Sequence, residues 1–319
     1  MKKKKSMLRF ALILSTFITF VSTVTTFIVG NRVYKKTFKV TPHEIGARKR
    51  VHERRLQKLD EYEHQKFMVD NPKNGYPIET IQIQSPIRNE DVIVIVHGIQ
   101  GSYYDLLEVA FRYLDDGKNI IMYNQRQSGL TGGTNSTFGL YERFDLEAVC
   151  KIAKQAYPNG KIGVHGFSMG AATATMHSEL NEKSQLVDFY ILDSPFHTMA
   201  SAVDMGVNHG KDTKLPNWFV KFSGSIVLKL RERVTYKDIV PIKSIKHTTK
   251  PILFMHGEQD NVTAPKSSFE LCKAINHKNK RLKIFKEQDH CTAYFRKTDE
   301  YFTEIYSFIE EFFPADSKK

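Results

Sequence analysis

The sequence predicts an α/β fold in which a mostly parallel sheet carries helices on both faces. Three observations support this. From residue 77 onward, short runs rich in β-branched residues alternate with helical stretches, as right-handed crossovers between parallel strands require. Residues 197–250 are far too long for one crossover helix and predict a small helical cap. An uncharged run near the start of the chain predicts an additional N-terminal transmembrane helix.

Composition and charge narrow the possible functions. The 319 residues carry a formal net charge of +12. Residues 1–66 hold 16 Lys and Arg against 5 Asp and Glu, whereas the remaining 253 residues hold 31 against 30. The basicity therefore belongs to the N-terminal arm, and no nucleic-acid partner is expected for the neutral body. The three cysteines form no C-x-x-C pair, which argues against a disulfide framework and a zinc site.

The N-terminal segment, residues 1–30, is interpreted as a basic tail and a membrane anchor. Four lysines precede the uncharged residues 10–29, of which thirteen are apolar and seven are Ser or Thr. Twenty helical residues span about 30 Å, the thickness of a bilayer's hydrocarbon core. A cleaved signal peptide is the alternative, but its apolar stretch is usually shorter and ends in a small-x-small site. We therefore expect an uncleaved single-pass anchor in the cell membrane.

Residues 31–75 are expected to form a charged helical stalk or linker. "TPHE" at residues 41–44 has the residues of a helix start, and the helix should run to about Met68 before "NPKNG" ends it. The stalk is either simply solvated or bound to anionic lipid headgroups. Positive charges flank the apolar run almost equally, but an N-terminal basic cluster usually stays inside. The domain that follows is therefore expected outside the cytoplasm.

Residues 76–319 are expected to form one domain with the cap inserted at about residues 197–250. Only one strand is expected before the buried run "VIVIVH", which would leave the sheet short at that edge. Each later strand is followed by a helix or by the cap. Strands are predicted at residues 78–84, 92–97, 119–123, 161–166, 187–192, 251–257 and 281–286, with helices at 105–114, at 141–157 and from 169 onward.

The stretch "VHGFSMGAAT" contains Ser168 in the spacing G-x-S-x-G. A strand precedes it, and a run of small residues opens a helix after it. On so sharp a turn the positions two before and two after the serine must lack bulk, which explains Gly166 and Gly170. The turn would expose the hydroxyl above the sheet, at a helix N-terminus that favours developing negative charge. Ser168 is therefore the candidate nucleophile.

A serine hydroxyl needs a base to take its proton. "GEQDNVTAP" places Asp260 just after one strand, and "EQDHCTAY" places His290 just after the next. His290 would act as general base and acid, and Asp260 would orient its ring. Asp193, in "ILDSPF", is the alternative acid, because it ends the strand that follows the nucleophile's helix. Asp260 is preferred, since Ser194 and Pro195 suit Asp193 to a structural turn.

An oxyanion hole needs two backbone N–H groups. One should come from Met169, directly after the nucleophile. The other should come from the loop "VHGIQGS", most simply through Ile99. No part of this mechanism requires a metal or a cofactor, and none is expected.

These stretches resemble the α/β-hydrolase superfamily, in particular its membrane-anchored bacterial serine hydrolases of the serine aminopeptidase-like and acyl-esterase-like group. The resemblance covers residues from about 76 to 314 and rests on "VIVIVHGIQGS", "FGLYERFDL", "GVHGFSMGAATA", "ILDSPF", "GEQDNVTAP" and "DHCTAY". It implies a Ser168–His290–Asp260 triad and acyl-enzyme chemistry. It says little about the substrate.

The expected function is that of a serine esterase: a carboxylesterase or lipase-like enzyme, or a thioesterase, acting on a small-molecule or lipid-like ester. A peptide substrate is a close alternative, because the same triad cleaves amides. Nothing in the sequence resembles an amine-binding glutamate pair, so the ester is preferred. Acyl transfer to another alcohol is a further variant. A non-catalytic membrane-tethered binding protein is the alternative from a different class, which loss of a triad residue would have favoured.

Overall fold

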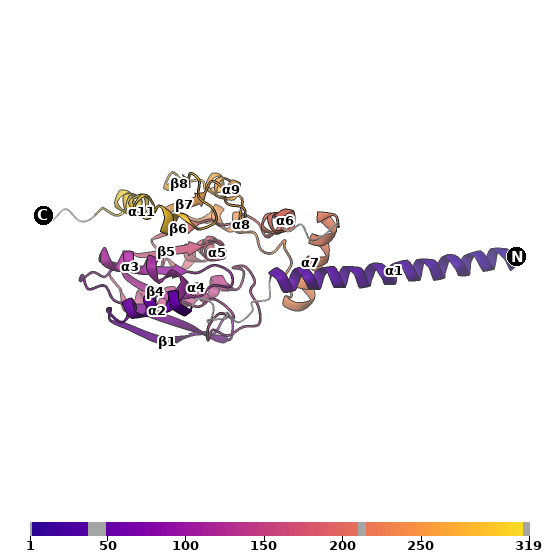
Figure 1. Ribbon diagram of the computed structural model, residues 1–319, viewed down its shortest axis with the longest axis horizontal. Coiled ribbons are helices and arrows are strands. Elements are labelled where there is room, and N and C mark those ends of the chain that lie inside the picture. Colours follow the sequence, from indigo (N-terminus) through magenta and orange to yellow (C-terminus); the bar gives the residue numbers. More distant parts are fainter. Residues whose placement is uncertain (1, 38–48, 210–214, 315–319) are drawn as a thin grey trace.

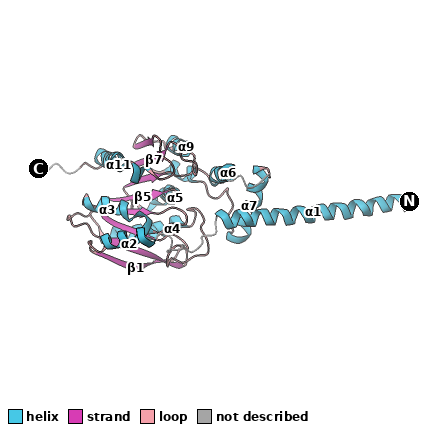
Figure 2. Cartoon of the chain, viewed as in Figure 1, coloured by secondary structure: helices cyan, strands magenta, loops and turns pink. Residues whose placement is uncertain are grey.

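The computed structural model describes residues 2–37, 49–209 and 215–314, shown in Figures 1 and 2. Its centre is an eight-stranded sheet in the order β1-β2-β4-β3-β5-β6-β7-β8. β1 pairs antiparallel with β2, β2 pairs antiparallel with β4, and all other neighbours are parallel. The strands are β1 (His64–Asn71), β2 (Tyr76–Ile83), β3 (Val92–Val96), β4 (Asn119–Tyr123), β5 (Ile162–Phe167), β6 (Phe189–Asp193), β7 (Ile252–Gly257) and β8 (Lys280–Phe285).

Helices cover both faces of this sheet, as the sequence predicts. The longer helices of the described residues, including those that do not touch the sheet, are α1 (Lys2–Thr37), α2 (Lys49–Leu59), α3 (Leu107–Asp115), α4 (Glu142–Ala156), α5 (Met169–Ser184), α6 (Met199–His209), α7 (Asn217–Glu232), α9 (Lys266–Ala274) and α11 (Thr298–Phe312). Single turns are formed by η1 (Tyr103–Leu106), α8 (Pro241–Ser244), η2 (Ile245–His247) and α10 (Ala293–Arg296).

Alternation along the strands divides the hydrophobic core into two layers. On β3, Ile93 and Ile95 face one layer together with side chains of α3 and α11. Val92, Val94 and Val96 face the other layer, which α4, α5 and α9 complete. Because β3 is buried along its whole length, its sequence is a continuous apolar run rather than an alternating one.

The prediction for residues 31–75 is wrong in its second half. α2 ends at Leu59, and β1 then joins β2 in an antiparallel hairpin, so the domain begins near His64 rather than at residue 76. The hairpin turns at Asn71, whose side-chain oxygen accepts hydrogen bonds from the backbone N–H groups of Lys73 and Asn74. The expectation of a shortened sheet edge is wrong for the same reason. The predicted helix start at residues 41–44 lies outside the described residues.

The cap follows β6 and contains α6, α7, α8 and η2. A connection that leaves β6 at its carboxyl end and returns to β7 must cross that edge of the sheet, where ligands bind in open α/β sheets. α1 leaves the body as a long, isolated helix and packs only its last turns against α7 (Figure 1). The apolar stretch of α1 is long enough to cross a membrane, and none of it is buried.

Candidate active site

Ser168 lies on a sharp turn between β5 and α5. Its backbone has φ +54° and ψ −115°, a conformation that an L-residue adopts only under strain. The Ser168 N–H donates to the Asp193 carbonyl at 2.8 Å, and the Ser168 carbonyl accepts from the Ala172 N–H at 3.0 Å. These two bonds hold the strained residue between β6 and the first turn of α5.

The glycines on either side of Ser168 are sterically required. A Cβ on Gly166 would overlap the backbone of Gly170 and Ala171. A Cβ on Gly170 would overlap the carbonyl oxygens of Val96 and His97, at the end of β3. The spacing G-x-S-x-G therefore reflects how closely the start of α5 packs against the end of β3.

The structure brings the three predicted residues into one hydrogen-bonded relay. His290 Nε2 lies 2.8 Å from Ser168 Oγ, and His290 Nδ1 lies 2.7 Å from Asp260 Oδ2. With Nδ1–H donating to the carboxylate, Nε2 is the nitrogen that accepts the serine proton. The Asp260 side chain is buried, whereas the His290 side chain remains 19% exposed. The arrangement can activate the Ser168 hydroxyl for attack on a carbonyl carbon.

The surroundings of Asp260 keep it ionised. Its Oδ1 accepts from the backbone N–H groups of Val262 and Thr263, both at 2.9 Å, and its Oδ2 also lies 3.1 Å from His256 Nε2. Burial alone would raise the pKa of Asp260, but the hydrogen bonds from His256 and His290 outweigh it and hold that pKa below its ordinary value.

The pKa of His290 moves in the opposite direction. Burial opposes its protonation, but the hydrogen bond to the Asp260 carboxylate and the charge of that carboxylate raise the pKa of His290 above its ordinary value. Burial also raises the pKa of the Cys291 thiol, so the thiol stays protonated near neutral pH. The Asp260 carboxylate is therefore the negative charge that stabilises the imidazolium.

Asp193, the alternative acid, faces other partners. Its Oδ2 accepts from the Tyr301 hydroxyl at 2.8 Å, and its Oδ1 accepts from the Ser194 hydroxyl at 2.9 Å. Tyr301 in turn contacts the buried ring of His165 at 3.0 Å. Burial raises the pKa of Asp193. Asp260, and not Asp193, is therefore the carboxylate hydrogen-bonded to His290.

The loop that carries Ile99 lies against the turn at Ser168. A Cβ on Gly98 would lie 3.3 Å from the Ser168 Cβ. Met169 is the first residue of α5, where a helix leaves its backbone N–H groups without intrahelical partners. Among the described residues, the backbone N–H groups of Ile99 and Met169 make no hydrogen bond to another protein atom. Both remain available for an oxyanion.

Gln125 connects this loop to α5, a role that no local sequence pattern indicates. Its side-chain N–H₂ donates to the His97 carbonyl, and its side-chain oxygen accepts from the Thr173 hydroxyl at 3.1 Å. Its backbone N–H donates to His97 Nε2 at 2.9 Å, which leaves Nδ1–H of that ring to donate to the Gly98 carbonyl. The connection joins three segments that are distant in sequence.

His256 and Thr263 were also missed, although both lie near Asp260 in sequence. The Thr263 hydroxyl lies 3.1 Å from Asp260 Oδ2 and 3.2 Å from His290 Nδ1. The pattern Asp-x-x-Thr, in which an aspartate accepts from backbone N–H groups two and three residues later, is a turn signal that could have identified Thr263. His256 could be identified only once its place at the end of β7 was known.

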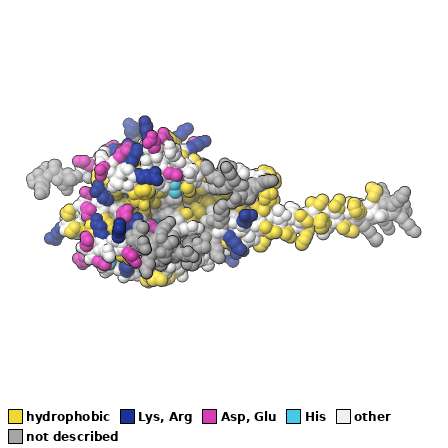
Figure 3. Space-filling model, in the orientation of Figure 1, with side chains coloured by type: hydrophobic (Ala, Val, Ile, Leu, Met, Phe, Trp, Pro, Cys, Tyr) yellow, Lys and Arg dark blue, Asp and Glu magenta, His cyan; other side chains and the backbone are white. Residues whose placement is uncertain are grey.

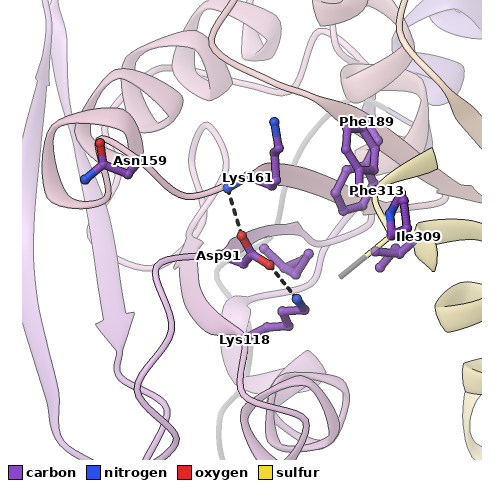
Figure 4. A pocket seen from close by; sticks show the side chains of 9 residues that line it. Asp91, Lys118, Asn159, Lys161, Phe189, Ile309 and Phe313 are labelled. Carbon is purple, nitrogen blue, oxygen red and sulfur yellow. Dashed lines mark hydrogen bonds and ion pairs between the residues drawn. The ribbon is translucent and has the colours of Figure 1, made fainter. Parts of the chain in front are cut away.

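Two cavities lie in the described part of the chain, one of them beside this site. One, of about 250 Å³, is lined by α6 and by the loop after Asp260, including Phe196, His197, Ala202 and Thr263. Another, of about 270 Å³, lies at the opposite, amino edge of the strands, where Lys118 Nζ and the Lys161 backbone N–H bond to Asp91 (Figure 4). Within the same ranges, no cluster of three or more His, Cys, Asp or Glu side chains could hold a metal ion.

The order of the strands and the turn at Ser168 together define an α/β hydrolase. A family model described as the alpha/beta hydrolase fold matches residues 91–222. The Bacillus subtilis protein YqkD is 30% identical over 237 residues, which is 74% of this chain and 76% of YqkD. The chain belongs to the α/β-hydrolase family.

Solved structures show the same fold. An esterase from Pyrococcus furiosus superposes with a TM-score of 0.65 at 21% identity, covering 80% of this chain and 95% of the esterase. An acylaminoacyl peptidase from Pyrococcus horikoshii superposes with a TM-score of 0.58 at 19% identity, covering 83% of this chain but 44% of the peptidase. At these identities the two structures show the fold alone.

Proposed function

We propose that this protein is a serine hydrolase that cleaves a small-molecule or lipid-like ester through an acyl-enzyme. The observation that carries the proposal is the relay from Asp260 through His290 to Ser168, with hydrogen bonds of 2.7 and 2.8 Å. A structural serine has no need of a strained backbone, a buried carboxylate and a partly exposed histidine aimed at its hydroxyl.

The reaction follows from this geometry. Ser168 Oγ attacks the ester carbonyl while His290 Nε2 takes its proton, and the oxyanion that forms is stabilised by the N–H groups of Met169 and Ile99. His290 then gives the proton to the leaving alkoxide, and an acyl-Ser168 ester remains. A water molecule, deprotonated by His290, then attacks the acyl carbonyl. The bond to Ser168 Oγ breaks, His290 returns the proton to Ser168, and the acid is released. Throughout, Asp260 keeps the imidazole ring oriented and stabilises its charged form.

The test of this proposal is labelling with a fluorophosphonate together with hydrolysis of a series of p-nitrophenyl esters. Labelling and hydrolysis should both be lost in Ser168→Ala. The matched control is Ser184→Ala, at the other end of α5. Its labelling and hydrolysis should equal those of the wild type. Full hydrolysis by Ser168→Ala would reject the proposal. Faster cleavage of peptide than of ester substrates by the wild type would change the proposed substrate class from esters to peptides.

We further propose that α1 is an uncleaved anchor and that the domain lies outside the cytoplasm. The helix suits lipid, because the hydroxyls of Thr16, Thr19, Thr23 and Thr25 each donate to the carbonyl four residues earlier at 2.8 Å. Cleavage near residue 30 would also remove side chains that pack on the cap. Protease added to intact spheroplasts should digest the domain. Its survival until lysis would reverse the topology.

A further inference from the structure

The last turns of α1 are built into the cap. Gly30 lies so close to α7 that a Cβ there would overlap Ser223 and Val227. From the other side, a Cβ on Gly224 would meet Val33 at 2.9 Å. The two helices therefore approach each other through small residues, as helices do where backbones must pack closely.

Polar contacts continue this interface beyond the apolar part of α1. The Tyr34 hydroxyl donates to Glu232, which also accepts from Asn135 Nδ2 at 3.0 Å. Arg231 donates to the Asn31 side chain at 2.7 Å. α7 is thus held on one side by α1 and on the other by the loop that precedes α4.

The length of α1 places α7 at a membrane surface. The uncharged run of α1 ends at Val29, and its twenty residues span about 30 Å, the hydrocarbon thickness of a bilayer. Gly30, the point where α7 crosses, therefore falls at the boundary between lipid and water. Gly30 lies against Ser223 and Val227, Asn31 bonds to Arg231, and Val33 lies against Gly224, so α7 crosses α1 at this depth instead of running alongside it. α7 therefore lies across the end of α1, close to the boundary between lipid and water (Figure 1).

The side chains of α7 fit this placement. Near its start, Trp218 is 67% exposed and Phe222 is 54% exposed. Two turns after Phe222 on the same stripe comes the exposed Lys229, and one turn later, just after the end of α7, comes the exposed Arg233. Figure 3 shows hydrophobic side chains along α1 and gathered again where it meets the body. Aromatic rings at headgroup depth with cations beyond them are typical of helices that lie in a membrane interface.

The cap also links this surface to the candidate active site. α6 and α7 arise from the insertion after β6, at the edge of the sheet where Ser168, Asp260 and His290 lie. Figure 1 shows the cap and α1 on the same side of the sheet. A body held through α7 therefore turns its candidate active site toward the membrane and not away from it.

We propose that α7 is a membrane-docking helix: Trp218 and Phe222 enter the interface of the bilayer that holds α1, and the site takes a lipid-like ester from that bilayer. The part concerning the substrate rests on the proposed function, whereas the docking itself does not. The exposed stripe of α7 would contact a lipid surface with anionic headgroups, because its cations, Lys229 and Arg233, attract negative charge.

The docking can be measured on the unmodified chain, because Trp218 is its single tryptophan. The full-length protein would be reconstituted in vesicles of phosphatidylcholine and phosphatidylglycerol, with and without brominated acyl chains. We expect blue-shifted emission that brominated lipid quenches and aqueous iodide does not. Quenching by iodide alone would overturn the proposal. Protection from both quenchers would overturn it as well, in favour of a protein partner or a second copy of the chain.

A pair of variants tests the link to the substrate. Phe222→Ser should lower the ratio of hydrolysis of a vesicle-borne ester to hydrolysis of a soluble ester by roughly tenfold, since the apolar burial of one aromatic ring is lost. The control is Phe269→Ser on α9, which is 53% exposed and far from α7 in sequence. Its ratio should equal that of the wild type. Equal ratios in both variants would overturn delivery from the bilayer.

A third variant, Gly30→Leu, keeps α1 apolar but separates it from α7. We expect Trp218 to become accessible to iodide in this variant, and unchanged lipid quenching would contradict the role of the helix crossing. If the wild type hydrolyses neither vesicle-borne nor soluble ester, the proposed function fails, while the fluorescence result still decides whether α7 docks.

Discussion

The functional side chains at the carboxyl edge of the sheet are buried or hydrogen-bonded within the domain, whereas those on the exposed stripe of α7 are left uncovered. At the sheet edge, Asp260 is 4% exposed and its carboxylate is surrounded by donors. On α7, Trp218 and Phe222 are more than half exposed and extend from the body. The first region is completed by the fold itself, because its donors and acceptors find one another within the domain. The second contains apolar surface that the domain does not cover, so what completes it lies outside the chain.

Removing the Asp260 carboxylate should impair catalysis at the carboxyl edge of the sheet without changing the docking of α7. We predict that Asp260→Asn lowers turnover on a soluble ester by roughly 10⁴, because the imidazole then adopts the wrong tautomer. Trp218 in this variant should be quenched by brominated lipid as in the wild type. Asp193→Asn, which alters a buried carboxylate outside the relay, should lose about tenfold or less. The reverse ranking of the two variants would move the acid to Asp193.

Hydrolysis at the candidate active site should depend on pH, whereas docking of α7 should not. His290 must be neutral to act as a base, and its pKa is raised above the ordinary 6.5. We therefore expect kcat/KM to be low at acid pH, where the imidazole is protonated. It should rise with pH through a single transition that lies above pH 6.5. In Asp260→Asn the residual activity should show this transition at lower pH. Lipid quenching of Trp218 should stay constant over the same range, because α7 contains no histidine. Full activity well below pH 6.5 would contradict the assigned role of His290.

The sequence predicted the candidate site better than the edges of the fold. Ser168, Asp260 and His290 could be predicted because each follows a strand, and carboxyl ends of parallel strands meet at one edge. β1 could not, because its eight residues, HQKFMVDN, are mostly polar and gain a strand conformation only by pairing with β2. Contacts between segments far apart in sequence, such as Gln125 with His97 and Gly30 with α7, leave no local pattern at all.

A smaller effect on kcat is expected from Gln125, which supports the candidate active site through contacts between segments distant in sequence. Gln125→Leu would leave the His97 carbonyl and the Thr173 hydroxyl without their shared partner. The Thr173 hydroxyl keeps its bond to the Met169 carbonyl, so the buried His97 carbonyl is the group left unsatisfied. That costs about 1–3 kcal/mol, and we predict a fall in kcat of roughly tenfold, with KM nearly unchanged. Gln84→Leu, at an exposed position beyond β2, is the control and should retain wild-type kcat. A variant of Gln125 that changes KM alone would place this residue in substrate binding instead.

In the proposed reaction, Ser168 carries the acyl group between attack by the serine and attack by water. A slowly deacylated p-nitrophenyl ester would be mixed with excess full-length protein and quenched in acid within one turnover. We predict a burst of p-nitrophenol approaching one per chain, and an acyl adduct that peptide mass spectrometry assigns to the peptide containing Ser168. Hydrolysis at the same rate with no adduct, or with the adduct on another residue, would contradict this role of Ser168.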